Sequence, residues 1–93
     1  MESLHKRTMS DVANSTTPLK ATFRIKMNGE SVAIATVGQA WRFINSISAV
    51  EWMEFRSLHS DARAALEAAA DDAMRSVQAT DALRILFVRA KLL

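Results

Sequence analysis

Cysteine is absent from the chain, which excludes disulfide bonds, thiolate zinc sites and a cysteine nucleophile. Only two glycines are present, and neither belongs to a glycine-rich pattern that binds phosphates or places a nucleophilic serine on a sharp turn. The single proline, Pro18, lies near the N-terminus and marks the expected boundary of the folded part. These absences argue against the commonest catalytic and metal-binding motifs.

The chain also lacks a large excess of either charge, since 12 Lys and Arg against 10 Asp and Glu give a formal net charge of +2. This balance is weak support for a partner held by electrostatic attraction. The longest apolar runs have only four residues, as in Ile85–Val88, and are too short to span a bilayer. The first residues lack the apolar segment of a secretory signal. We therefore expect a cytoplasmic protein with no membrane partner.

The first part of the chain differs in composition from the rest. Residues 1–19 are rich in serine, threonine and charged side chains and show no apolar period, which predicts a disordered N-terminal leader. The remaining residues, 20–93, have the size of a single small domain.

A β-hairpin is predicted around Asn28-Gly29, because these two residues reach positive φ more readily than others. The register set by a two-residue loop also pairs Ala21 with Thr36. It places the apolar residues of both segments on one face: Phe23, Ile25, Met27, Val32 and Ile34. Since an isolated two-stranded ribbon is barely stable in water, helices must cover this face.

Three helices are predicted downstream. Thr36 and Gln39 fit a capping box, which indicates a helix over 37–46. An alanine-rich helix follows from between residues 52 and 57 to about 77, and a last helix from Thr80, as its N-cap, to about 92. The sequence thus predicts an α+β fold, a two-stranded antiparallel β-hairpin packed on three α-helices (ββααα).

Several short pieces of the sequence, distributed over the predicted hairpin and the predicted helices, resemble those of a known family. Besides the strand pair they are Thr36-Val37-x-x-Ala40 with Ile44, Trp52, Ala62-Arg63 with Ala65, and Phe87-Val88-Arg89-Ala90. In these pieces the chain resembles a family of small bacterial domains of unknown function, the family numbered 982 (DUF982), over residues 19–93. The resemblance implies an α+β domain. It implies no activity, because the family is named for the lack of a known one.

No arrangement of polar residues indicates catalysis. His59 on the second predicted helix has no second histidine or cysteine as a metal partner, and we expect a structural role for it. Glu67 and Asp71 have a spacing at which they can chelate a divalent cation, but a solvated face with Arg75 as partner explains them more simply. We predict no enzymatic activity, cofactor or metal site, and identify no small-molecule ligand.

Three cations line the polar face of the first predicted strand, namely Lys20, Arg24 and Lys26. A basic ribbon of this kind can lie along phosphates, which makes a nucleic-acid-binding regulator the alternative function. Against it, the face carries no aromatic side chain for base stacking. A solvated sheet face that discourages edge pairing explains the same cations.

The last predicted helix carries more apolar side chains than one buried stripe requires. The first stripe comprises Ala79, Leu83, Leu86, Phe87 and Ala90. A second stripe, Ile85, Val88 and Leu92, lies on an adjoining side. Exposed apolar surface marks interaction sites, and most oligomers are two-fold symmetric.

We therefore predict a non-enzymatic interaction or accessory module that forms a homodimer through the second stripe of the last helix. The alternative is that both stripes are internal, because this helix is central in the monomer. An open strand edge of the hairpin offers a second route to a dimer, by pairing of sheets.

Overall fold

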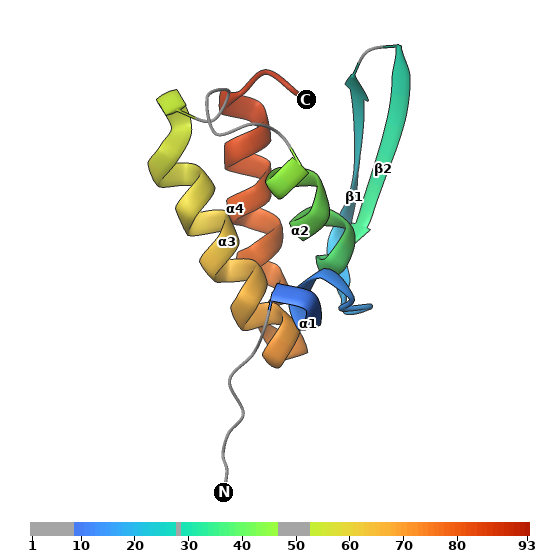
Figure 1. Ribbon diagram of the computed structural model, residues 1–93, viewed down its shortest axis with the longest axis vertical. Helices are drawn as coiled ribbons and strands as arrows, with labels where there is room; N and C mark the ends of the chain where they lie inside the picture. Colours follow the sequence, from blue (N-terminus) through green and yellow to red (C-terminus); the bar gives the residue numbers. More distant parts are fainter. Residues whose placement is uncertain (1–8, 28, 47–52) are drawn as a thin grey trace, which may run out of the picture.

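The computed structural model describes residues 9–27, 29–46 and 53–93. These residues form an α+β fold in which a two-stranded antiparallel sheet packs against helices (Figure 1), as predicted for the class. The elements in chain order are α1 (Met9–Ala13), β1 (Pro18–Met27), β2 (Glu30–Thr36), α2 (Val37–Ser46), a 3-10 turn (Met53–Phe55), α3 (Arg56–Asp71), a second 3-10 turn (Ala73–Arg75) and α4 (Ser76–Arg89). None of the helices so described is long and apolar enough to cross a bilayer.

Figure 1 shows how these elements are layered. The helices α3 and α4 run side by side, and both α4 and α2 pack against the hairpin, α4 beside β1 and α2 beside β2. The short α1 sits at the lower end of the molecule, and the turn of the hairpin points away from it.

The hairpin has the predicted register from its turn as far as Phe23, which pairs with Ile34. Gly29 has a φ of +81°, as a two-residue turn requires, whereas Asn28 lies outside the described residues. The side chains of Phe23, Ile25 and Ile34 are buried, so the predicted apolar face is the one that meets the helices.

The predicted pairing is wrong beyond Phe23. Thr36 pairs with Pro18 instead of Ala21, and the register shifts between Pro18 and Phe23. Additional residues therefore bulge out of β1 in this stretch. The same stretch is tied to α4, because the Lys20 backbone N–H donates to Thr80 Oγ1 at 2.9 Å. A tertiary hydrogen bond thus accompanies the departure from the regular ladder.

The predicted capping box is present at the junction of β2 and α2. The Gln39 N–H donates to Thr36 Oγ1 at 3.2 Å, and the Thr36 N–H donates to Gln39 Oε1 at 3.2 Å. The same Gln39 oxygen also accepts from the Ala35 N–H at 2.7 Å. These bonds satisfy backbone donors that a helix start leaves without partners. The helix covers residues 37–46, as predicted.

The core contains residues from α1, the hairpin, α2, α3 and α4, and the ring of Phe87 joins three of these elements. Phe87 is fully buried. Its ring meets Phe23 of β1 edge-to-face at a centroid distance of 5.3 Å, and Phe43 of α2 in the same manner at 5.7 Å. Such aromatic pairs contribute about 0.5–1.5 kcal/mol each beyond the area that they bury.

The boundary between α3 and α4 differs from the prediction. The chain leaves the helix at Asp72, whose backbone is extended and whose side chain accepts from the Met74 N–H at 3.0 Å. The predicted continuation to Val77 is therefore wrong. Thr80 is not an N-cap, because α4 begins at Ser76 and Thr80 lies inside it.

The predicted disordered leader is wrong for the part of it that the structure describes, and residues 1–8 lie outside that part. Val12 of α1 is only 1% exposed and belongs to the core. The Gly38 N–H donates to Ser15 O at 3.0 Å, and the Val37 N–H donates to Thr17 O at 2.9 Å. Since N–H groups at a helix start have no intrahelical acceptor, this segment supplies acceptors to α2.

Gly38 is the residue that permits this contact. A Cβ atom at this position would lie 2.5 Å from Ala13 O and 2.6 Å from Ser15 O. Both are backbone atoms, so neither can turn away as a flexible side chain would. Gly38 is therefore required for the close approach of the N-terminal segment to α2, although glycine is unfavourable inside a helix.

We predict that Gly38→Ala lowers the free energy of unfolding by about 2 kcal/mol, the usual scale of overpacking, as measured by urea denaturation. The control is the same substitution in a chain that lacks residues 1–17. There the clash is gone, and alanine is expected to stabilise the helix by up to about 1 kcal/mol. An equal loss of stability in both chains would contradict the proposed contact.

Candidate functional site

The outer side of α4 carries two of the apolar residues predicted for self-association. Ile85 and Val88, both predicted for self-association, are 50% and 54% exposed. Val77, which the predicted helix start excluded, is 48% exposed and lies on the same helix. The spacing from Val77 to Ile85 and Val88 is that of one helical face. An aliphatic outer face of α4 is thus defined by these three residues.

Leu92, the third residue predicted for self-association, lies elsewhere. The helix ends at Arg89, and Lys91 has a φ of +60°. The Leu92 N–H donates to Phe87 O at 2.8 Å, and the Lys91 N–H donates to Val88 O at 3.1 Å. This pair of bonds is a Schellman motif, which turns the chain back over the helix end. Leu92 is consequently half-buried against the core, and the predicted stripe of Ile85, Val88 and Leu92 does not form one helical face.

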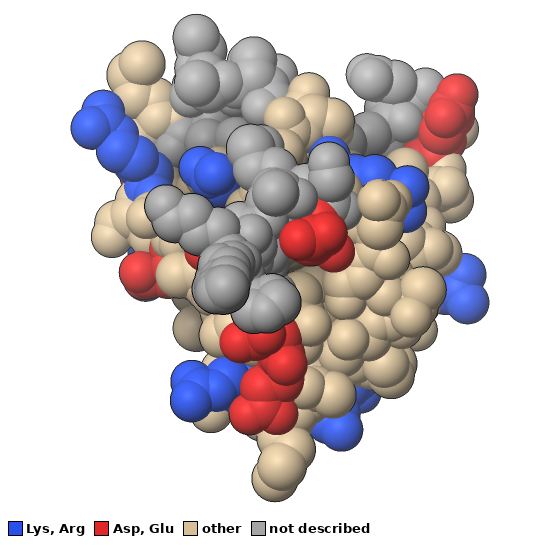
Figure 2. Space-filling model, turned by 60° about the horizontal axis from the view of Figure 1, so that its bottom comes forward, with Lys and Arg blue, Asp and Glu red and all other residues tan. Residues whose placement is uncertain are grey.

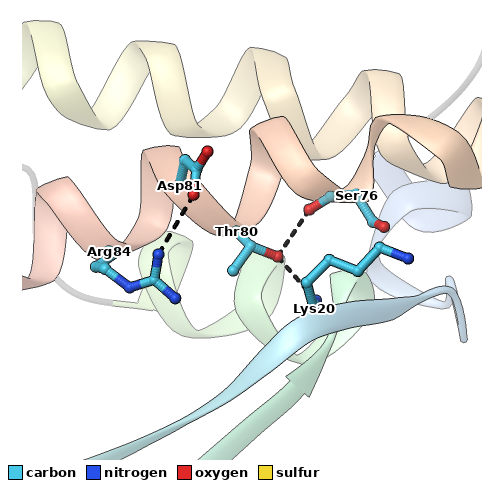
Figure 3. A network of polar contacts seen from close by, with 5 residues as sticks. All are labelled: Lys20, Ser76, Thr80, Asp81 and Arg84. Carbon is cyan, nitrogen blue, oxygen red and sulfur yellow. Dashed lines mark hydrogen bonds and ion pairs between the residues drawn. The ribbon is translucent and has the colours of Figure 1, made fainter.

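An ion pair lies within the aliphatic outer face of α4. Arg84 Nη1 and Asp81 Oδ1 are 3.3 Å apart (Figure 3), and both side chains are at least half exposed. An exposed pair of this kind contributes little to the stability of the monomer. The Arg84 guanidinium also lies 5.8 Å from the ring centroid of Phe23, where it covers the edge of the core between α4 and β1.

The three predicted nucleic-acid contacts, Lys20, Arg24 and Lys26, are all exposed on β1. Figure 3 shows that the backbone of Lys20, not its side chain, makes the contact with Thr80 of α4. The side chain of Lys20 is therefore not needed for this contact. Arg24 and Lys26 pair across the ladder with the small residues Ala33 and Ser31.

Charge is dispersed over the face of the molecule that Figure 2 shows. Basic and acidic side chains are both scattered over it, and the basic ones do not gather into one continuous patch. A nucleic-acid-binding surface needs several cations close together, because each phosphate contact adds to affinity. The view in Figure 2 therefore gives no support to binding through this face.

The other polar residues of interest take part in packing. His59 is half-buried, and its Nε2 lies 3.0 Å from Ile44 O, which joins α3 to α2. The Arg63 guanidinium lies 5.2 Å from the ring centroid of Trp41, and its Nε is buried without a hydrogen-bond partner among the described residues. Within residues 9–27, 29–46 and 53–93, no group of three or more His, Asp or Glu lies close enough to hold a metal ion.

The chain matches no family model, and no curated protein or solved structure matches it. The resemblance to the family numbered 982 therefore stays a prediction.

Thr80 is the polar residue on which the position of β1 depends most directly. Its hydroxyl donates to Ser76 O at 2.7 Å and accepts from the Lys20 N–H at 2.9 Å, and the residue is only 2% exposed. We predict that Thr80→Val, which keeps the shape, lowers the free energy of unfolding by about 1–3 kcal/mol, because the Lys20 N–H loses its acceptor. Thr80→Ser is the control and should retain most of the stability. A loss in Thr80→Ser as large as in Thr80→Val, measured by urea denaturation, would contradict this prediction, because only the valine variant removes the acceptor of the Lys20 N–H.

Proposed function

We propose that the protein is a non-enzymatic interaction module that forms a two-fold homodimer through the aliphatic outer face of α4. The observation that carries this proposal is the order of residues along that face. The midpoint between Val77 and Val88 along α4 is also the midpoint between Asp81 and Arg84. Read in the opposite direction, the stretch from Val77 to Val88 therefore keeps the positions of its two valines and exchanges the acidic with the basic residue.

A pattern of this kind suits an antiparallel contact between two copies of α4. In a two-fold interface each contact occurs twice, so that residue i meets residue j and residue j meets residue i. Val77 of one copy then lies opposite Val88 of the other, and Asp81 lies opposite Arg84. Ile85 flanks the contact and adds apolar area.

The size of this face sets the expected affinity. Three aliphatic side chains that are about half exposed offer less than the roughly 800 Å² per partner of a standard interface. We therefore expect a weak dimer, with a dissociation constant on the order of tens of micromolar.

We predict that Asp81→Arg weakens the dimer at least roughly tenfold, because it places like charges opposite each other across the axis. The double variant D81R/R84D restores opposite charges and should recover the affinity of the natural chain. Sedimentation velocity over a concentration series into the high micromolar range measures both. Ala64→Glu, an exposed change on α3, is the control for added charge.

A chain that stays monomeric throughout this series would overturn the proposal. A dimer that all of these variants leave unchanged would overturn the assignment to α4.

Nucleic-acid binding is the second candidate, and the exposure of Lys20, Arg24 and Lys26 on one strand is the observation that favours it. If the cations bind phosphates, a generic DNA duplex is retarded in a gel at low salt, and Arg24→Ala together with Lys26→Ala reduces the slope of affinity against salt by about 2. Arg56→Ala on α3 is the matched control. Absence of retardation for the natural chain at low salt would eliminate this candidate.

A further inference from the structure

The second strand of the hairpin has an open edge. Within the described residues the sheet contains two strands, so there β2 pairs with β1 on one side only. Along a strand of an antiparallel pair, successive residues direct their N–H and C=O groups alternately toward the partner and away from it. The Ala35 N–H donates to Gln39 and not to β1, which places Ala35 on the open side. Ser31 and Ala33 precede it at even spacing and face the same way.

This edge has a defined length. Beyond the hairpin itself, no described residue makes a backbone hydrogen bond to Ser31 or Ala33. At one end the side chain of Gln39 occupies the N–H of Ala35, and at the other end the turn at Gly29 ends the strand. Ser31 and Ala33 therefore offer two N–H donors and two carbonyl acceptors to a further strand.

A shallow hollow of about 350 Å³, largely open to solvent, lies beside this edge, between β2 and α2. This volume is at the lower end of the range for ligand sites, roughly 300–1,000 Å³. Its walls are mostly apolar, with half-buried Val32 and Phe43 among the residues that line it. The complete lining comprises Val32, Ala33, Ile34, Gln39, Arg42, Phe43 and Ser46.

Arg42 is the only charged residue in this lining. It is exposed, and its Nε donates to Gly38 O at 3.3 Å, which anchors the side chain on α2. None of the described residues that line the hollow is acidic, so none neutralises this charge. A ligand in the hollow therefore meets apolar walls and one positive charge.

We propose that the open edge of β2 and the adjoining hollow bind an extended peptide segment, which adds to the sheet as a third strand. The segment pairs with the backbone of Ser31 and Ala33, and directs an apolar side chain toward Phe43 and a carboxylate toward Arg42. Strand addition of this type takes affinity from backbone hydrogen bonds and specificity from pockets for alternate side chains.

Charge favours such a segment over a second copy of this chain. A second copy that paired its own β2 with this edge would bring another Arg42 to the same junction, where no acidic residue in the lining offsets it. The site is also independent of the aliphatic outer face of α4. The helix α2 packs beside β2, whereas α4 packs beside β1, so both surfaces can be occupied at once.

The test uses two capped pentapeptides, threonine-valine-threonine-glutamate-threonine and the same residues in reverse order, because the strand direction is not assumed. The full chain is titrated and its amide resonances are followed by nuclear magnetic resonance. With at least one peptide, the amides of Ser31, Ala33 and Phe43 are expected to shift saturably. Replacing the glutamate of the peptide with lysine should weaken binding roughly tenfold. Absence of saturable shifts with both peptides would overturn the proposal.

Two variants sharpen this test. Arg42→Glu should reverse the preference, so that the lysine peptide binds better than the glutamate peptide, whereas Arg56→Glu on α3 should leave the preference unchanged. Ala33→Pro removes one donor on the open side and should abolish binding, since proline is tolerated at strand edges whose N–H faces solvent. If Ala33→Pro fails to fold, the reversal by Arg42→Glu still decides.

Two further outcomes would overturn the assignment. If the Arg42→Glu variant still binds the glutamate peptide better than the lysine peptide, the proposed contact between Arg42 and a carboxylate is wrong. Shifts of Ser31 and Ala33 that depend on protein concentration in the absence of peptide would show that a second copy occupies the edge. Neither outcome bears on the homodimer through α4, which is measured by sedimentation of its own variants.

Discussion

A ribbon of two strands has one apolar face and no further strand to stabilise it, so it persists only where something covers that face. In this protein α4 supplies the cover together with α2. Phe87 meets the Phe23 ring of β1 at 5.3 Å and the Phe43 ring of α2 at 5.7 Å, so that a single side chain joins three elements. Thr80 adds direction to this apolar contact, because its hydroxyl accepts from the backbone of β1. Hydrophobic burial holds the layers together, and the hydrogen bond fixes how β1 lies across α4.

The parts of the fold that were predictable from the sequence depend on neighbouring residues. The glycine of the turn takes a positive φ, and Thr36 and Gln39 are three residues apart in a capping box. The parts that were not predictable depend on distant ones. The bulge in β1 accompanies a bond to Thr80, sixty residues away, and the residues after α1 supply acceptors to the start of α2. Composition alone could not distinguish such a segment from a disordered one.

The same division explains the outcome for the outer face of α4. The excess of apolar residues on the last helix was visible in the sequence, and Ile85 and Val88 are indeed half exposed. The sequence places Leu92 on the helix, but the chain leaves the helix in a left-handed turn at Lys91. Glycine usually marks such a helix end, and here lysine takes its place. The sequence assigns the start of the last helix to Thr80 and so leaves out Val77. In the structure α3 already ends at Asp72, and α4 begins at Ser76. An error of one turn at each end was enough to change which residues share the outer face.

Open strand edges invite uncontrolled pairing, and proteins limit them with charges, bulges or coverage. Here each edge is limited in a different way. The edge of β1 is bulged and bonded to α4, and its outward side chains include Arg24 and Lys26. The edge of β2 carries small uncharged residues, and it ends at the point where Gln39 Oε1 accepts from the Ala35 N–H. Gln39 also closes the capping box of α2, so one side chain starts the helix and shortens the edge. Because Gln39 has both roles, the start of α2 and the open length of β2 are linked. A shift in where α2 begins would also change how much of the β2 edge stays open.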